Sequence, residues 1–473
     1  MVFSSITFLV IFLPLFLLVY TACPKAYRSW VMLIFSAVFY AWGAPRFVFV
    51  LFGTTLLDFY LVNWIDRLQV NWKRRLCLVV SLSLNLGLLF YFKYYNFFLE
   101  NVNQVLSFGG SDTFNYVEVI LPVGISFYTF ETITYVVDVY RRVHKPLANF
   151  WDYQRYIILF PKLIAGPIVR FHTIADQLMV RTETVDDFFA GFIRFCVGLG
   201  KKVLLANVMG QQADAIMDLP PDQITTLQSW IGILAYTFQI YFDFSGYSDM
   251  ALGLGRIMGF RFPENFDNPY TSTSITEFWR KWHISLGQWM KNYLYIPLGG
   301  NRANSQIRVL FNLWFVFLVS GLWHGASWNF VIWGVYHGLF LILDRLFLIK
   351  VLDRLGKQLS AIVTFLVVVV GWVFFRIETT SDAFAYLHTM FVPEVLSGVL
   401  PDSLRFWTIF ILAVGISFSG LFKIGQKAER YIYAYGEVQH QVTVRLAFAL
   451  LLYVLCLSSI TTANFNPFIY FRF

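Results

Sequence analysis

Charged side chains are scarce in this sequence. Only 14% of its 473 residues are Asp, Glu, Lys or Arg, whereas 58% are hydrophobic and 20% are aromatic. Soluble domains carry about a quarter of charged residues, because a water-facing surface needs them. The scarcity therefore excludes an ordinary soluble protein of this length. A lipid bilayer acting as the solvent accounts for the composition.

Several motifs are also missing. The four cysteines share no CxxC spacing, so neither a disulfide framework nor a cysteine metal site is expected: Cys23, Cys77, Cys196 and Cys456. The sequence contains no P-loop, no GxGxxG motif after a strand and no GxSxG motif. Nucleotide hydrolysis and serine-nucleophile chemistry therefore lack a starting point. No internal repeat and no linker rich in Pro, Gly or Ser divides the chain, which predicts a single domain over 1–473.

Long apolar runs recur along the whole chain. A helix that crosses a bilayer needs about 20 mostly apolar residues. Such runs lie near 6–22, 30–50, 48–65, 76–92, 118–138, 188–209, 228–247, 309–323, 328–349, 359–375, 404–422 and 446–462. They predict an all-α integral membrane protein with roughly ten to twelve transmembrane helices plus re-entrant helices. Met1–Ser5 carries no charge, so we interpret the first run as a retained span and not as a signal peptide.

The cations lie in short loops between the apolar runs. This pattern indicates that the cations behind the net charge of +8 face the lipids of the membrane. Nucleic-acid binding is therefore not expected. Basic loops at 25–28, 67–75 and 141–145 alternate with connections at 93–117 and 376–403 that hold few cations. The positive-inside rule then places the basic loops and Lys423–Arg445 in the cytoplasm. Both termini, including the tail 464–473, are expected outside, in a bacterial cytoplasmic (inner) membrane protein.

The central part of the chain, about 150–345, does not follow this alternation. Pro, Gly and charged residues interrupt its apolar runs at 160–162, 166–167, 253–256 and 261–263. Non-helical backbone at membrane depth survives only where it is buried in protein or lines a wet cavity. The interruptions predict a central catalytic region with a cavity or tunnel walled by the outer spans.

Two carboxylates close the apolar run that ends in Tyr241–Met250. Placing Asp243 and Asp249 at membrane depth costs several kcal/mol, so each is expected to face a cavity or a partner. Either residue could orient a base or bind a substrate. Equally, both could cap and cross-link helices, which is the more frequent use of such groups.

His324 lies in the motif Ser320–Trp328, at the end of a clean apolar span. An imidazole titrates near neutrality, so in a cavity it can take a proton from a hydroxyl and return it. Trp323 and Trp328 can wall such a site from water. The alternative is a structural histidine bonded to a neighbouring helix.

His283 follows Arg280 and Lys281 in an amphipathic stretch that runs from Glu277 to Tyr295. This stretch predicts a helix at the membrane surface, with His283 in a packing role or in support of the site. His337 is expected in the core. The three histidines lack the tight spacing of a metal motif, and no metal is predicted.

Further segments complete a family resemblance: Met1–Ser5, Leu121–Tyr128, Leu163–Pro167 and Gly299–Arg302. Together with the clusters around Asp243, His283 and His324, and in this order, they span the chain from end to end. The sequence resembles the membrane-bound O-acyltransferase (MBOAT) family. It is closest to the bacterial alginate and peptidoglycan O-acetyltransferase branch, and it is similar also to the D-alanyl transferases of teichoic acid modification.

The resemblance implies a ring of tilted helices around a thin centre with a tunnel. It implies that His324 is the catalytic histidine and His283 the second one, with Asp243, Asp249, Trp323, Trp328 and Asn329 as substrate or tunnel candidates. It also implies acetyl-CoA as a cytosolic acyl donor, with no bound cofactor. An extracytoplasmic partner protein would finish transfer to a polysaccharide: alginate-like, cellulose or peptidoglycan. The chemistry agrees, because acyl transfer from a thioester needs a base and oxyanion stabilisation, but no metal.

Two other functions remain open. Transfer of D-alanine to teichoic acid uses the same chemistry with another acyl group. An ion-coupled transporter would use Asp243, Asp249 and His324 to bind ions or relay protons. Inverted repeats would favour the transporter, and the sequence shows none.

Pro467 is expected to end the last helix, so that a short aromatic tail lies on the outer face. One interpretation of the tail is an interfacial aromatic belt. The other makes Tyr470 an acyl acceptor, because tyrosine can act as a covalent carrier. Its hydroxyl, with a pKa near 10, leaves more readily than a sugar alkoxide. The tail also resembles the aromatic C-terminal ending of related acyl-export systems.

Overall fold

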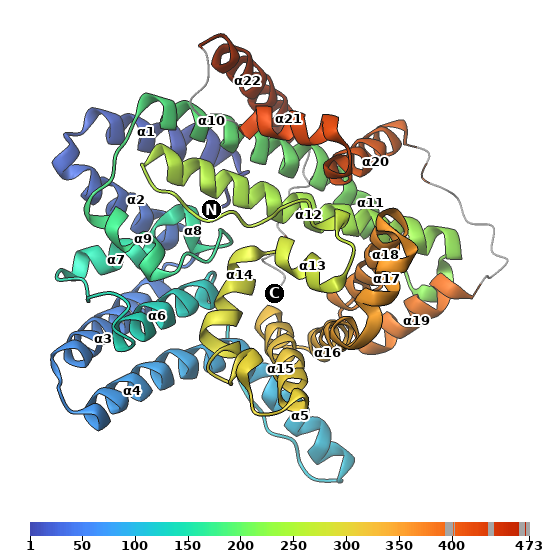
Figure 1. Cartoon of the computed structure of the whole chain (residues 1–473), viewed down its shortest axis with the longest axis horizontal. Helices are drawn as coiled ribbons and strands as arrows, with labels where there is room; N and C mark the ends of the chain where they lie inside the picture. Colours follow the sequence, from blue (N-terminus) through green and yellow to red (C-terminus); the bar gives the residue numbers. More distant parts are fainter. Residues whose placement is uncertain (393–400, 402, 434–438, 463–468, 470–473) are drawn as a thin grey trace. The chain divides into compact units, whose positions relative to one another are not determined.

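The computed structural model describes residues 1–392, 401, 403–433, 439–462 and 469 (Figure 1). Helices dominate these residues, and the described part of the chain contains no β-strand beyond an isolated antiparallel bridge between Phe266 and Trp282. The all-α prediction is therefore confirmed. The chain divides into two compact units, Met1–Thr182 with Gly259–Phe262, and Glu183–Met258 with Pro263–Phe473.

The first unit contains nine α-helices among its described residues. They are α1 (Leu13–Ala22), α2 (Arg28–Gly43), α3 (Phe47–Arg67), α4 (Asn71–Leu89), α5 (Tyr95–Phe108), α6 (Ile125–Tyr140), α7 (Phe150–Ile158), α8 (Phe160–Leu163) and α9 (Phe171–Met179). Asn149 caps α7 by accepting a hydrogen bond from the backbone of Trp151. The chain breaks at Leu159, directly before the interruption predicted at 160–162, which itself forms α8. It bends again after α8, where the second interruption was predicted at 166–167. Lys162 in α8 is fully buried and pairs with Glu131 of α6.

The second unit holds all the candidate catalytic residues. Its helices are α10 (Val185–Gly200), α11 (Asn207–Met217), α12 (Thr226–Ile257), α13 (Ile275–Lys281), α14 (Ile284–Met290), α15 (Gln306–His324), α16 (Trp328–Leu343), α17 (Ile349–Leu355), α18 (Lys357–Arg376), α19 (Thr380–Phe391), α20 (Leu404–Ser417), α21 (Lys423–Tyr433) and α22 (Gln439–Thr462). Thr225 and Gln228 start α12 with a reciprocal capping box. This helix is the centre of the unit, because α10, α11, α18, α19 and α20 all pack against it (Figure 1).

Glycines bring α10 and α12 into close contact. A Cβ added at Gly198 would lie 2.5 Å from the carbonyl oxygen of Gly246, and one at Gly191 would lie 2.5 Å from that of Gly253. Small residues allow helix backbones to approach in this way. The predicted interruption at 253–256 is wrong, because α12 continues to Ile257. Gly253 serves helix packing there and does not end the helix.

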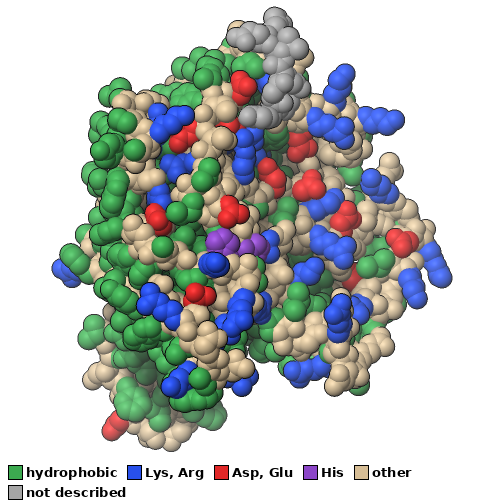
Figure 2. Space-filling model, turned by 60° about the vertical axis from the view of Figure 1, so that its left-hand side comes forward, with side chains coloured by type: hydrophobic (Ala, Val, Ile, Leu, Met, Phe, Trp, Pro, Cys, Tyr) green, Lys and Arg blue, Asp and Glu red, His purple; other side chains and the backbone are tan. Residues whose placement is uncertain are grey.

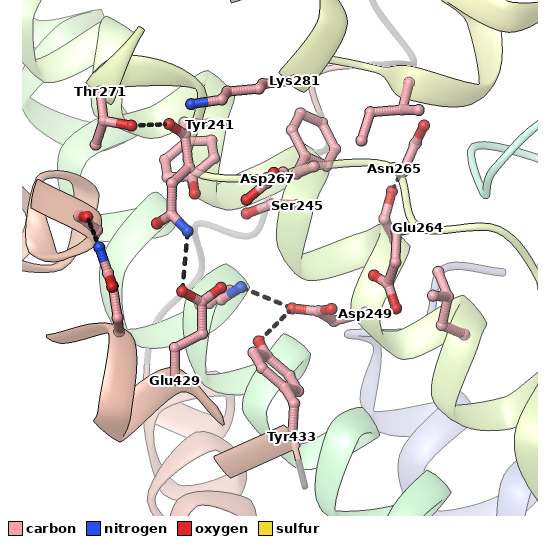
Figure 3. Close-up of a pocket in the computed structure, with 18 of the residues that line it drawn as sticks. Tyr241, Ser245, Asp249, Glu264, Asn265, Asp267, Thr271, Lys281, Glu429 and Tyr433 are labelled. Carbon is pink, nitrogen blue, oxygen red and sulfur yellow. Dashed lines mark hydrogen bonds and ion pairs between the residues drawn. The ribbon is translucent and has the colours of Figure 1, made fainter. Parts of the chain in front are cut away.

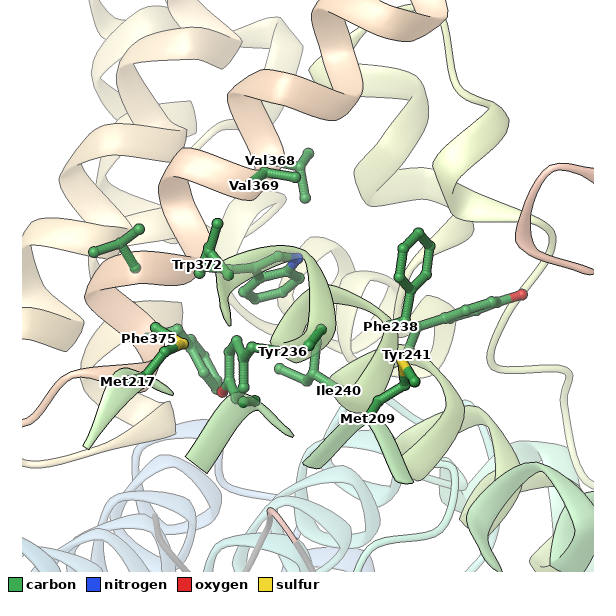
Figure 4. Packing of buried hydrophobic residues seen from close by; sticks show 14 of the residues in the cluster. Met209, Met217, Tyr236, Phe238, Ile240, Tyr241, Val368, Val369, Trp372 and Phe375 are labelled. Atoms are coloured by element: carbon green, nitrogen blue, oxygen red, sulfur yellow. The ribbon is translucent and has the colours of Figure 1, made fainter. Parts of the chain in front are cut away.

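Aromatic and aliphatic side chains fill the core of the second unit. Figure 4 shows Tyr236, Phe238 and Ile240 of α12 among Val368, Val369, Trp372 and Phe375 of α18. Trp372 is 1% exposed and Val369 is completely buried. The core thus ties α12 to α18, which lies next to the helix that carries His337.

Six described helical segments are long and apolar enough to cross a membrane. They are Phe47–Arg67, Asn71–Phe108, Gln306–His324, Lys357–Arg376, Leu404–Leu421 and Gln441–Thr462, and Thr7–Ala22 is a shorter apolar helix. Large apolar side chains on these segments face outward, for example Phe49 at 80% exposure and Ile411 at 67%. Figure 2 shows that hydrophobic side chains cover much of the visible surface. The chain is therefore an integral membrane protein, while ten to twelve spans and a tunnel remain predictions.

Candidate active site

His324 is the last residue of α15, and Gly325 continues in an extended conformation. The imidazole is 6% exposed and is surrounded by aromatic rings. Its centroid lies 5.0 Å from that of Trp323, 5.2 Å from Trp333 and 5.1 Å from Phe375. The predicted enclosure of His324 by aromatic side chains is present, although its members differ in part from those predicted.

Gly321, three residues before His324 in α15, determines how closely α15 and α16 approach each other. A Cβ at this position would lie 2.2 Å from the carbonyl oxygen of Phe330 and 3.0 Å from the Cα of Gly334. Any side chain would push the two helices apart. The glycine therefore brings the aromatic face of α16, with Trp333, against the imidazole.

The other residues predicted near His324 lie in different environments. Trp323 is buried, at 5% exposure, whereas Trp328 is 55% exposed. Asn329 is buried and its Nδ2 donates to the carbonyl oxygen of Ile377 at 2.5 Å. Its Oδ1 has no hydrogen-bond partner among the described residues. Trp323 and Asn329 therefore remain candidates for the site, while Trp328 is more than half exposed.

His283 corrects the prediction of a continuous helix at the membrane surface. Helix α13 ends at Lys281 and α14 begins at Ile284, with His283 between them at φ +45°. A left-handed backbone at a residue other than glycine is uncommon and breaks the helix. The side chain is 2% exposed. His283 is thus an interior residue, because the break turns it inward from the amphipathic surface that sequence periodicity suggested.

Asn265 holds His283 from a neighbouring loop. The Nδ1 of His283 lies 3.1 Å from the Oδ1 of Asn265, and the backbone N–H of Ile284 donates to the carbonyl oxygen of Asn265 at 3.0 Å. The Nε2 of His283 is buried without a hydrogen-bond partner among the described residues. Burial lowers the pKa of His283 to about 3, so its imidazole is neutral.

The indole ring of Trp323 lies near both His283 and His324. The ring of His283 lies 6.2 Å from that of Trp323, which neighbours His324 in sequence and in space. Phe244 of α12 packs edge-on against His283 at 4.6 Å. The structure therefore brings His283 and His324 to the same part of the unit. His337 is buried in the same region, since the ring of Trp333 lies 5.2 Å from that of His324 and 5.0 Å from that of His337. The Nε1 of Trp279 donates to the Nδ1 of His337 at 3.4 Å.

Asp249 links three helices through charged contacts (Figure 3). Its carboxylate accepts hydrogen bonds from Lys201 Nζ at 2.7 Å, Arg194 Nε at 3.0 Å and the hydroxyl of Tyr433 at 3.0 Å. Arg194 also pairs with Glu264. Asp249 thus cross-links α10, α12 and α21, one of the two uses predicted for it. Arg194 and Lys201 were not predicted as site residues, although their position in an otherwise apolar run is a signal that the sequence contains.

A polar cavity of about 820 Å³ lies next to this cluster (Figure 3). Its lining includes six cations and five anions: Arg194, Lys201, Arg256, Lys281, Lys357 and Arg430, with Asp249, Glu264, Asp267, Glu277 and Glu429. Neutral polar residues, among them Ser245, Ser248 and Asn265, also line it. Because Asn265 bonds directly to His283, the cavity reaches the immediate partner of a predicted catalytic residue.

Asp243 is buried on α12 and does not line the cavity. Lys202 Nζ lies 2.7 Å from one of its carboxylate oxygens, and the backbone N–H of Ile469 donates to the other at 2.9 Å. Ile469 is 4% exposed and lies within the core of the unit. Tyr470 lies outside the described residues. Within the described part of the chain, no group of three His, Cys, Asp or Glu side chains is arranged to hold a metal ion.

Comparison with known proteins defines the class. The family model of the membrane-bound O-acyltransferases matches residues 88–375, which include His283 and His324. The chain therefore belongs to the membrane-bound O-acyltransferase family, as its sequence motifs predicted.

Individual relatives within this family are named as O-acetylases or O-acetyltransferases. A probable alginate O-acetylase of Pseudomonas aeruginosa is 45% identical over 83% of this chain and 75% of its own length. A probable alginate O-acetylase of Pseudomonas putida is 40% identical over the full length of both chains. A peptidoglycan O-acetyltransferase of Helicobacter pylori is 35% identical over 82% of this chain and 80% of its own. The prediction of an acyltransferase of the O-acetyltransferase class is thereby confirmed.

Proposed function

We propose that this protein takes an acetyl group from acetyl-CoA in the cytosol and passes it through the membrane for O-acetylation of an extracytoplasmic polysaccharide. The acceptor polymer is alginate-like, cellulose or peptidoglycan. Relatives named for the acetylation of alginate and of peptidoglycan support this class of acceptor. The observation that carries the proposal is the polar cavity whose lining includes Asn265, the hydrogen-bond partner of His283.

The lining of the cavity suits a CoA thioester. Lys357 and Arg430 are exposed cations at this cavity and can meet the phosphates of CoA. Serine and asparagine side chains farther in can hydrogen-bond the amides of the pantetheine arm. Helix α21 forms part of the wall, and the loop charges place Lys423–Arg445 in the cytoplasm. The cavity would then open on the side where acetyl-CoA is found.

The chemistry requires one base. His324 takes the proton of the acceptor hydroxyl as its oxygen bonds to the thioester carbonyl carbon. The carbon–sulfur bond then breaks, and the proton passes from the imidazolium to the leaving thiolate, which departs as CoA. His283 assists this proton transfer. Asn329 is a candidate donor to the oxyanion, since its buried amide lies at the start of α16, five residues after His324.

We propose Tyr470 as the first acceptor of the acetyl group. The adjoining Ile469 supports this, since its backbone is held at Asp243 in the core of the unit that contains His324. An extracytoplasmic partner protein would then move the acetyl group from the tyrosine ester to a polysaccharide hydroxyl, whose proton returns to the phenol oxygen. The aryl ester is the more reactive of the two, so this second transfer is downhill.

The experiment below also distinguishes two alternative functions. Transfer of D-alanine would need a different donor and the same histidines. Ion-coupled transport would use Asp243 and Asp249. Both carboxylates are paired with lysine or arginine, so a transported cation would have to displace a cation of the protein.

Incubation of the purified full-length protein with acetyl-CoA radiolabelled in the acetyl group tests the proposal. We expect label to leave CoA and to lodge on the protein. His324→Ala should lower this rate by about 100-fold or more, because general-base catalysis contributes roughly 10² to 10⁴. His283→Ala should be milder. His388→Ala is the matched control, since this histidine is exposed on α19.

An unchanged rate in the His324→Ala protein would overturn the assignment of the base. Label that stays on CoA with the wild-type protein, together with transfer from a D-alanyl thioester, would favour the first alternative. Proton-coupled ion flux in vesicles without any acyl transfer would favour the transporter.

A further inference from the structure

Asn265 is the centre of a buried hydrogen-bond network around His283. Its Oδ1 lies 3.1 Å from His283 Nδ1, 3.2 Å from the backbone nitrogen of Ser285 and 2.8 Å from Ser285 Oγ. Its Nδ2 donates to Ser248 Oγ of α12 at 3.0 Å. All four side chains are at most 2% exposed. The network is therefore buried, although Ser248 and Asn265 also belong to the lining of the polar cavity.

The backbone of Ser285 determines which way the amide of Asn265 faces. A backbone N–H can only donate, so the amide atom that it meets has to be the oxygen. The amide nitrogen then faces Ser248, whose hydroxyl can accept. This orientation follows from hydrogen-bond chemistry and is independent of how the amide atoms are assigned.

The orientation of Asn265 determines the tautomer of His283. An amide oxygen only accepts, so the hydrogen between the two side chains belongs to His283 Nδ1. The hydroxyl of Ser285 also lies 3.4 Å from Nδ1, but it donates its hydrogen to Asn265 Oδ1 at 2.8 Å, so toward Nδ1 it can only accept. In a neutral imidazole the other nitrogen, Nε2, then carries a lone pair. This Nε2 is buried and has no hydrogen-bond partner among the described residues. The strained backbone of His283, at φ +45°, adds a conformational cost that is common at functional sites.

We propose that Asn265 is a positioning residue for acyl transfer, because it holds His283 in the tautomer whose Nε2 is a fixed hydrogen-bond acceptor. This inference rests on the proposed function. A lone pair can accept a proton or a hydrogen bond but cannot donate one to an oxyanion. His283 therefore assists His324 in proton transfer, and the donors that stabilise the oxyanion have to come from other residues.

No charged side chain accounts for the neutral state of His283. The surrounding elements carry these titratable groups: Tyr236, Tyr241, Asp243, Tyr247, Asp249 and Arg256 of α12, Glu264 and Asp267 beside Asn265, Glu277, Arg280 and Lys281 of α13, and His324 of α15. Burial is what lowers the pKa of His283 to about 3. A carboxylate in place of the amide of Asn265 would keep the acceptor at Nδ1 but would stabilise the imidazolium and raise this pKa. As the pH falls, His283 would then become protonated at a higher pH in the Asn265→Asp protein than in the wild type.

Histidine-selective ¹⁵N nuclear magnetic resonance tests the tautomer without any substrate. The difference between spectra of the wild type and His283→Ala should show a protonated Nδ1 and an unprotonated Nε2. In Asn265→Ala this pattern should be lost or mixed, and in Asn265→Asp it should persist at neutral pH. A protonated Nε2 in the wild type would overturn the inference, whatever the donor or acceptor of the enzyme proves to be.

Acyl-transfer kinetics test the role. We expect Asn265→Ala to lower kcat by about 10-fold to 100-fold with little change in KM, since one positioning contact supports a catalytic group. Asn265→Asp should recover part of the rate and lose activity more steeply as the pH falls. In a His283→Ala background, Asn265→Ala should slow the enzyme no further, because it acts through His283.

Asn63→Ala is the matched control, since this asparagine donates only to the carbonyl oxygen of Phe59 on its own helix. A merely structural Asn265 would give the same loss with and without His283, and Asn265→Asp would be no more acid-sensitive than the wild type. Either result would overturn the role. Failure of acetyl transfer by the wild type counts against the proposed function, while the tautomer measurement still decides the inference.

Discussion

Asp243 shows how a single buried charge can organise distant segments. It pairs with Lys202, whose Nζ also donates to Asn207 Oδ1 at 2.8 Å, and it accepts the backbone N–H of Ile469. An unpaired carboxylate at this depth would be costly. The carboxylate instead receives two contacts, one from the ammonium of Lys202 and one from the backbone N–H of Ile469. Ile469 is thereby held beside α12.

Tyr470→Phe tests whether the hydroxyl of Tyr470 accepts the acetyl group. The substitution keeps the aromatic ring and removes only the hydroxyl, so it should abolish polymer acetylation at unchanged protein level. The measurement is the acetyl content of the extracellular polymer in cells that express each variant. Tyr60→Phe, which alters a tyrosine 54% exposed on α3, is the control. Acetylation at the wild-type rate would leave Tyr470 as a membrane anchor only.

Helix α21 forms one wall of the polar cavity. Gln426, Glu429, Arg430 and Tyr433 of this helix line the cavity, and the Nδ2 of Asn268 donates to Glu429 at 2.9 Å. Tyr433 reaches Asp249 with its hydroxyl, and its ring lies 5.0 Å from the guanidinium of Arg194. Hydrogen bonds of Glu429 and Tyr433, together with the contact of the Tyr433 ring with Arg194, therefore attach α21 to the rest of the wall.

Tyr433→Phe removes the hydroxyl of this attachment and keeps the ring. A hydrogen bond to a charged group contributes about 1.5–3 kcal/mol, and part of this holds α21 in place. We expect KM for acetyl-CoA to rise about 3-fold to 10-fold with kcat nearly unchanged, because the looser wall binds the donor less well. Initial rates across a range of acetyl-CoA concentrations measure this.

Tyr431→Phe on the same helix is the control for Tyr433→Phe, since Tyr431 is partly exposed and does not line the cavity. A fall in kcat at constant KM in the Tyr433→Phe protein would place α21 in the chemical step and contradict its role as a wall.

Orientation in the membrane is a property of the whole molecule. The distribution of loop cations predicts that 66–75 and 423–445 face the cytoplasm, while 376–403 faces the outside. The direction of acyl flow depends on this assignment. It is also what would place the cavity beside α21 on the donor side.

Cysteine labelling with a membrane-impermeant thiol reagent tests the orientation on intact cells. A cysteine in place of Glu378 should react, whereas cysteines in place of Lys73 or Lys427 should react only after the membrane is permeabilised. All three positions are exposed, so burial does not limit the reagent. Native Cys196 and Cys456 are buried, and the parent protein serves as the background for Cys23 and Cys77. The opposite labelling pattern would reverse the proposed direction of transfer.

The sequence by itself determined the properties that depend on local composition and order. Apolar runs and scarce charge established an all-α membrane protein, because the bilayer imposes both on every spanning segment. The ordered motifs identified the family and singled out His324 and His283. His324 was recognisable because it ends a clean apolar span, and its helix ends where the sequence suggested.

Only the tertiary structure decided how these residues are held. The helix break that buries His283 depends on Asn265, 18 residues earlier, and the wall of the cavity depends on Tyr433, 184 residues after Asp249. The N–H of Ile469 reaches Asp243 across 226 residues. Periodicity and composition report the surroundings of a residue within its own helix. Hydrogen bonds between distant segments form only once packing has brought the chain together, so no local pattern could assign these partners.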